Sequence, residues 1–142
     1  MRRYLISVAL LALSLVAGAK TAVNEGPSGE TPKFTMHLMG DSTMADKDIS
    51  KGNPERGWGM VFENFVDPSV RVINYAKNGR STKSFIDEGL WDKVKANIRP
   101  GDYVFIEFGH NDEKSNKPKV YAAPWGAYQD NLRMFIRTAR EL

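Results

Sequence analysis

The chain contains no cysteine and only two histidines among its 142 residues. The first absence excludes a disulfide framework and a thiolate metal site. The second leaves His37 and His110 as the only candidates for imidazole chemistry. Lysine and arginine outnumber aspartate and glutamate by only 20 to 17, so the net charge of +3 is weak evidence for a nucleic-acid or membrane partner. No group of side chains has metal-ligand spacing, and we expect neither a metal nor a cofactor.

The longest apolar run lies at the N-terminus, where two arginines precede it and the small residues 17–19 follow it. This pattern predicts that residues 1–19 are an export signal cleaved after Ala19, although a membrane anchor is the alternative. The run is short for a bilayer span, so we expect a secreted or periplasmic protein without a stable membrane anchor. Residues 20–32 contain glycine, proline and serine and are interpreted as a flexible linker. One domain, residues 33–142, remains.

Within that domain, short apolar segments typical of strands alternate with segments of helical periodicity. The strand segments are residues 34–39, 70–75 and 103–108, and the helical ones are 58–65, 90–98 and 128–139. This alternation predicts an α/β fold with a parallel sheet of about three strands and three main helices. Trp58 shares its helical face with Phe62 and Phe65, which favours a place in the core over a sugar-binding role. Residues 113–124 are polar, contain two prolines, and indicate a surface loop.

Each predicted strand is followed directly by a short polar motif. The motifs are Gly40-Asp41-Ser42-Thr43, Asn78-Gly79-Arg80-Ser81 and Gly109-His110-Asn111-Asp112. Because the carboxyl ends of parallel strands lie at one edge of a sheet, we expect the three motifs to meet there. Ser42 stands where a helix is expected to begin, and the positive end of a helix favours negative charge on a nearby oxygen. Capping of that helix by the same motif is the plain alternative.

With the segments Arg56-Gly57-Trp58-Gly59 and 74–82, these motifs resemble the SGNH, or GDSL-type, hydrolases. The resemblance is strongest to the rhamnogalacturonan acetylesterase group of carbohydrate esterases and covers about residues 33–142. It implies a three-layer α/β/α, flavodoxin-like fold. It also implies that Ser42 is the nucleophile and that the Ser42 N–H, the Gly79 N–H and the Asn111 amide form an oxyanion hole. An acetylated polysaccharide or a small ester would then be the substrate.

Further substrate contacts are expected from Asp41, Arg80 and His110, and Arg56 is a candidate for binding a sugar acid. The resemblance places the catalytic histidine in a later Asp-x-x-His segment, which this chain does not contain. His110 is therefore not expected to be the base, and His37 is expected to be a packed residue.

The last helical stripe continues to Leu142 without a stop signal, which favours the N-terminal part of an incomplete enzyme over a complete small domain. We therefore expect little esterase activity from this chain alone. Two alternatives remain open: a non-catalytic glycan-binding protein that keeps the esterase cleft, and a GDSL-type lipase or thioesterase.

Overall fold

The computed structural model describes residues 31–142. The predicted export signal, residues 1–19, and nearly all of the predicted linker lie outside the described residues. No helix in the described part is long and apolar enough to cross a membrane.

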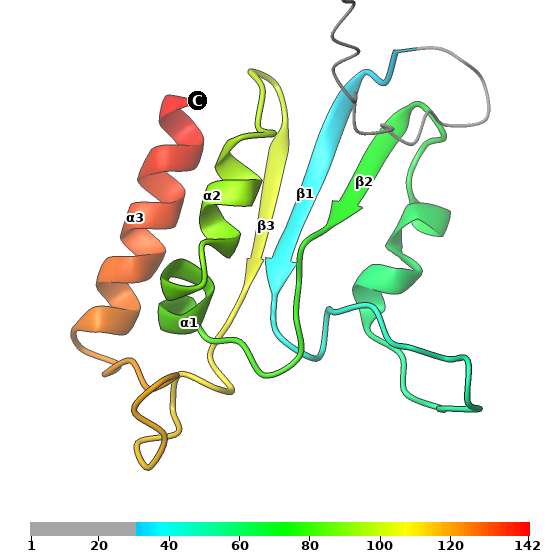
Figure 1. The fold of residues 1–142 in the computed structure, drawn as a ribbon. Helices are drawn as coiled ribbons and strands as arrows, with labels where there is room; N and C mark the ends of the chain where they lie inside the picture. Colours follow the sequence, from blue (N-terminus) through cyan, green and yellow to red (C-terminus); the bar gives the residue numbers. More distant parts are fainter. Residues whose placement is uncertain (1–30) are drawn as a thin grey trace, which may run out of the picture.

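Three parallel strands form one sheet in the order β2-β1-β3 (Figure 1). They are β1 (Phe34–Gly40), β2 (Val70–Asn74) and β3 (Tyr103–Glu107). Leu38 in the central strand lies opposite Asn74 on one side and Phe105 on the other, so the three carboxyl ends reach the same edge. The predicted α/β fold with a parallel sheet is confirmed, and each strand begins at the expected residue and ends one residue from the expected end.

Three helices cover one face of this sheet (Figure 1). They are α1 (Thr82–Asp87), α2 (Leu90–Lys95) and α3 (Ala127–Glu141). The first begins at a capping box, in which the Ser81 and Ser84 side chains each accept a hydrogen bond from the other residue's backbone N–H. Gly89 has φ +68°, a left-handed conformation that glycine adopts without strain, and it separates α1 from α2. The expected helices at 90–98 and 128–139 are thus present.

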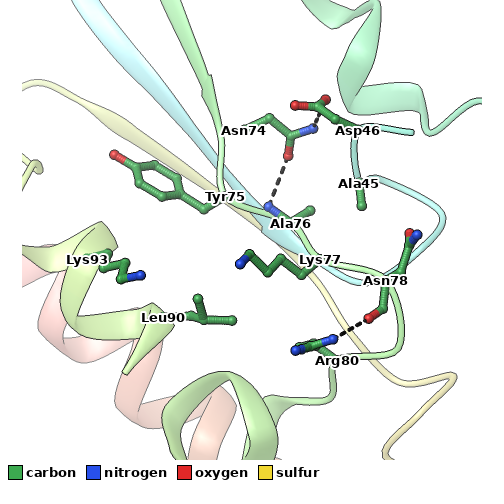
Figure 2. Close-up of a pocket in the computed structure, with 10 residues that line it drawn as sticks. All are labelled: Ala45, Asp46, Asn74, Tyr75, Ala76, Lys77, Asn78, Arg80, Leu90 and Lys93. Carbon is green, nitrogen blue, oxygen red and sulfur yellow. Dashed lines mark hydrogen bonds between the residues drawn. The ribbon is translucent and has the colours of Figure 1, made fainter. Parts of the chain in front are cut away.

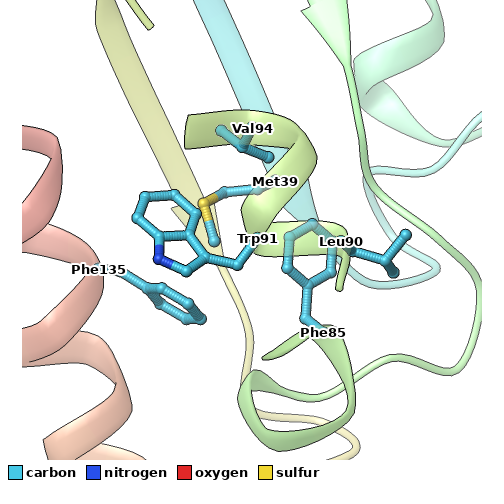
Figure 3. Close-up of a cluster of buried hydrophobic side chains, with 6 residues drawn as sticks. All are labelled: Met39, Phe85, Leu90, Trp91, Val94 and Phe135. Carbon is cyan, nitrogen blue, oxygen red and sulfur yellow. The ribbon is translucent and has the colours of Figure 1, made fainter. Parts of the chain in front are cut away.

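The main apolar core lies between the sheet and these helices (Figure 3). Its buried members are Met39, Phe85, Leu90, Trp91, Val94 and Phe135. The Trp91 and Phe135 rings meet edge to face at 5.0 Å between centroids, which joins α2 to α3. A smaller cluster, containing Leu38 and Met44, occupies the opposite face. Because successive strand residues point to opposite faces, Leu38 and Met39 enter different clusters.

The expected helix at 58–65 is wrong. The segment forms two short 3₁₀ helices, η1 (Trp58–Met60) and η2 (Phe62–Phe65). Trp58 is not a core residue, because its side chain is 38% exposed, and Phe65 is 78% exposed. The cause lies in the flanking glycines, whose backbone packs directly on the loop after β1: a Cβ atom at Gly59 would lie 2.5 Å from the Met44 carbonyl oxygen. The segment therefore packs through its backbone at Gly57 and Gly59, and not through a row of apolar side chains on one face of a helix.

Gly57→Ala is expected to lower the free energy of unfolding by about 1–3 kcal/mol, the usual cost of overpacking. An added Cβ would lie 2.0 Å from the Ala45 carbonyl oxygen, so the backbone would have to move. Alanine readily adopts the native φ of −88°, so the expected loss of stability comes from steric overlap and not from backbone strain. Urea denaturation checks the change. Glu55→Ala, at an exposed position two residues earlier in the same segment, is the control, and an equal loss in both variants would contradict the explanation.

Candidate active site

The loop after β1 is a tight turn rather than the start of a helix, which corrects the expected helix dipole at Ser42. The Ala45 N–H donates to the Asp41 carbonyl oxygen at 3.0 Å, and the turn ends there. The Asp41 carboxylate is 2% exposed and accepts from the Thr43 N–H at 3.0 Å and the Thr43 hydroxyl at 2.9 Å. Asp41 therefore holds the turn together, and its expected contact with substrate stays a prediction. Ser42 at the centre of the turn is half-buried.

Gly79 lies in a second turn, closed by the Arg80 N–H donating to the Lys77 carbonyl oxygen at 3.3 Å. Its φ of +77° is the conformation that the third residue of a type II turn requires, and glycine adopts it without strain. No atom lies within 4 Å of a Cβ built at Gly79, so backbone conformation rather than crowding explains the glycine. The residue is exposed, as a backbone donor for a bound substrate must be.

Two side chains tie the three motifs together. Lys47 donates from Nζ to the Ser42 carbonyl oxygen and, at 2.6 Å, to Asn78 Oδ1. Asn111, which is 4% exposed, donates from Nδ2 to the Arg80 carbonyl oxygen at 2.9 Å. The loop after β1 and the loop after β3 thus each contact a residue that adjoins Gly79. The expected meeting of the motifs at one edge of the sheet is supported by these contacts.

Several N–H groups in the three motifs have no hydrogen-bond acceptor within the described residues. Among residues 31–142, neither the Ser42 N–H nor the Gly79 N–H donates a hydrogen bond. The Asn111 amide uses one of its two N–H groups on Arg80, and its Oδ1 accepts from Lys114 Nζ at 2.6 Å. Backbone and amide N–H groups of this kind stabilise the oxyanion that forms when a hydroxyl attacks an ester carbonyl. The roles of Ser42, Gly79 and Asn111 themselves stay predictions.

The loop after β3 is anchored by Asp112, a member of the third motif to which the sequence assigned no role. Its carboxylate is 2% exposed and accepts from the backbone N–H and the hydroxyl of Thr82 at the start of α1. Asn131 on α3 donates to the same hydroxyl at 3.0 Å. Burial raises the pKa of Asp112 above its ordinary value, against the lowering effect of the Thr82 hydrogen bonds. Asp112 therefore fixes the position of its neighbour Asn111 relative to α1.

Glu107 at the end of β3 is a second residue that the sequence analysis missed. The single-proton Thr43 hydroxyl lies between the Glu107 and Asp41 carboxylates, and the Trp58 indole N–H donates to Glu107 Oε2 at 3.1 Å. Glu107 thus joins the turn after β1 to η1, and it explains why Trp58 lies at the edge of the sheet. Its position at the end of an apolar strand segment could have identified Glu107 as a candidate from the sequence.

Neither histidine contacts Ser42. His37 is fully buried, and its Nε2 lies 3.1 Å from Asp102 Oδ2, so the expectation of a packed residue is confirmed. The His110 ring is exposed, and its Nδ1 lies 3.5 Å from Glu113 Oε1 on the same loop. The Ser42 hydroxyl forms no hydrogen bond to any of residues 31–142. Within the same part of the chain, no three side chains of the metal-ligating types gather into a possible metal site.

The model of the GDSL-like lipase/acylhydrolase family matches residues 36–142, which contain all three motifs. This chain belongs to that family. Its relatives include the rhamnogalacturonan acetylesterase RhgT of Bacillus subtilis, 42% identical over 104 residues that make up 73% of this chain and 43% of the relative. A rhamnogalacturonan acetylesterase of Emericella nidulans is 38% identical over 75% of this chain and 35% of its own length.

The crystal structure of the YxiM protein of Bacillus subtilis has a similar fold, with a TM-score of 0.68 at 23% sequence identity. The similarity covers 78% of this chain and 30% of that protein. The chain thus spans less than half the length of these relatives. The described sheet and helices correspond to one part of the family fold, and the expected resemblance to SGNH hydrolases is confirmed.

Proposed function

We propose that this chain carries the nucleophile and the oxyanion hole of an ester hydrolase. The observation that supports this most strongly is a set of donors that bond to none of residues 31–142, the Ser42 N–H, the Gly79 N–H and one Asn111 N–H, on loops that Lys47 and Asn111 link to the turn around Gly79. In the proposed reaction, Ser42 Oγ bonds to the carbonyl carbon of an ester and loses its proton to a base. The alcohol then leaves with a proton, and water later releases the acid from the acyl-serine.

The base for this reaction is not among residues 31–142, because both histidines are held elsewhere. The chain on its own is therefore proposed to be a weak catalyst. Serine hydrolases without a triad member still accelerate hydrolysis roughly 10³–10⁴-fold over water through the oxyanion hole and binding. The proposed substrate is the acetyl ester of a pectic polysaccharide such as rhamnogalacturonan, since relatives with that name match the segment that holds the motifs.

Covalent labelling tests the proposed nucleophile. A p-nitrophenyl alkylphosphonate is expected to label Ser42 in preference to the exposed Ser50 and Ser115, because only Ser42 has adjacent donors for the developing oxyanion. Peptide mass spectrometry identifies the labelled residue. Ser42→Ala should remove the label, and Asn111→Ala should slow labelling by about 10²–10³-fold, the usual effect of one lost oxyanion donor. Labelling spread evenly over the exposed serines would contradict the proposal.

The absence of a histidine beside Ser42 favours one alternative, a glycan-binding protein that keeps the cleft without the chemistry. It predicts saturable binding of acetylated pectin fragments without any phosphonate label on Ser42. The labelling experiment therefore separates the two functions.

A further inference from the structure

A pocket of about 540 Å³ opens next to the candidate active site, beyond the carboxyl end of β2 (Figure 2). Three of its lining side chains are cationic, namely Lys77, Arg80 and Lys93, and one is anionic, Asp46. Figure 2 shows the ammonium groups of Lys77 and Lys93 directed into the space between them, above Leu90. Side chains from the turn around Gly79 and from α2 thus converge on one open volume.

The positive charge of this pocket is only partly compensated. Arg80 pairs with Glu88 at 2.9 Å, and Asp46 accepts a hydrogen bond from Asn74 at 2.8 Å. Neither Lys77 Nζ nor Lys93 Nζ takes part in an ion pair or hydrogen bond with any of residues 31–142. Two ammonium groups that face one volume without a carboxylate between them favour the binding of an anion there.

The rest of the pocket suits a sugar ring. Leu90 is 6% exposed and forms an apolar floor, and the Tyr75 ring and Ala76 provide further apolar surface. Burial raises the pKa of the Tyr75 phenol, which therefore keeps its proton at neutral pH and can donate to a hydroxyl or carboxylate. Apolar walls with a few polar groups at fixed positions are typical of small-ligand sites.

The pocket adjoins the turn that holds Gly79, because Asn78 and Arg80, which line it, are the two neighbours of Gly79 in the chain. In the proposed function, a polysaccharide that presents an ester to Ser42 and Gly79 would extend toward this turn. We propose that this pocket is a subsite for the carboxylate of a uronic acid unit in the same polysaccharide. The proposal rests on the proposed function for its choice of ligand, because pectic polymers are rich in such units.

The test is a calorimetric titration of the 142-residue chain with unesterified trigalacturonate at low salt. Lys77→Gln and Lys93→Gln are each expected to weaken binding about fivefold, the upper range for one exposed ion pair. Lys77→Arg should restore the affinity, since it keeps the charge. Lys119→Gln is the matched control, because Lys119 is an exposed lysine of the surface loop that does not line the pocket. Binding should also weaken as salt is added.

The same titration with fully methyl-esterified trigalacturonate removes the carboxylate charge and keeps the sugar rings, and we expect at least fivefold weaker binding. Equal affinity for the two trimers, or unchanged affinity in the Lys77 and Lys93 variants, would overturn the proposal. Inorganic phosphate that binds as tightly as trigalacturonate would also overturn it, by showing a site for any anion.

Ser42→Ala separates this proposal from the proposed function. It should abolish phosphonate labelling and weaken trigalacturonate binding less than Lys77→Gln or Lys93→Gln does. Trimer binding that depends on Lys77, without labelling of Ser42, would support the subsite and contradict the esterase function. Labelling of Ser42 with trimer binding that does not depend on Lys77 and Lys93 would support the esterase function and overturn the subsite.

Discussion

Acetate release by this chain from acetylated rhamnogalacturonan is expected to be roughly 10⁴-fold to 10⁶-fold slower than release by an intact enzyme of the family, the loss seen when a triad member is removed. The physical reason is the position of the two histidines. His37 is fully buried and bound to Asp102, and His110 lies beside Glu113 with its ring in solvent. Neither can take the proton from the Ser42 hydroxyl at hydrogen-bond distance, which general-base catalysis requires.

A coupled enzymatic assay for acetate measures this difference, with the RhgT protein of Bacillus subtilis as the comparison enzyme. His110→Ala should lower the residual rate far less than Ser42→Ala, which should remove what remains above the rate in water. Turnover close to that of the comparison enzyme, lost in His110→Ala, would show that His110 is the base and would contradict the account of the site.

Asp102→Ala is expected to lower the free energy of unfolding by about 3–5 kcal/mol, the cost of removing one partner of a buried ion pair or hydrogen-bonded pair. Asp102 precedes β3 and links three elements of the fold. Its carboxylate accepts from the Thr35 N–H at 2.7 Å, the Arg99 N–H at 2.9 Å and His37 Nε2 at 3.1 Å. The substitution leaves these donors without an acceptor, two of them at the central strand.

The loss should depend on pH. Although burial opposes ionisation, hydrogen bonds from His37 and from the Thr35 and Arg99 amides lower the pKa of Asp102 below its ordinary value. A lowered pKa in the folded state contributes stability that is fully present above the unfolded value of about 3.9 and is lost as pH falls through the folded value.

Urea denaturation at pH 7 and at pH 3 tests this prediction, and the difference between the native chain and Asp102→Ala should shrink at the lower pH. Glu63→Ala is the control, because Glu63 is exposed and its carboxylate forms no hydrogen bond or ion pair with any of residues 31–142. A difference that stays the same at both pH values would show that the Asp102 charge has no part in stability.

The sheet and its polar edge were predictable because strand periodicity and motif position are local properties. Leu38 and Met39 alternate between two apolar clusters as a buried strand requires, and each polar motif begins within four residues of the end of its strand. The 3₁₀ turns at 58–65 were not predictable from periodicity. Their geometry comes from Gly57 and Gly59 packing against the loop after β1, a contact between segments that the sequence does not place together.

The supporting contacts of the site could be predicted only in part. Lys47 bridges Ser42 and Asn78, yet nothing in its sequence neighbourhood distinguishes it from other surface lysines. Asp112 stood in a recognised motif, but its bond to Thr82 depends on how α1 packs against the loop after β3. Local motifs thus indicate where the proposed reactive groups lie, whereas the contacts that hold these groups depend on the folded structure.

A crystal structure of the chain with an alkylphosphonate bound to Ser42 Oγ would test the proposed oxyanion hole directly. We expect one phosphonyl oxygen to lie about 2.7–3.1 Å from the backbone nitrogens of Ser42 and Gly79 and from the Asn111 amide nitrogen, as an oxyanion would. An adduct whose oxygens all face solvent, with Gly79 and Asn111 out of hydrogen-bond reach, would contradict it.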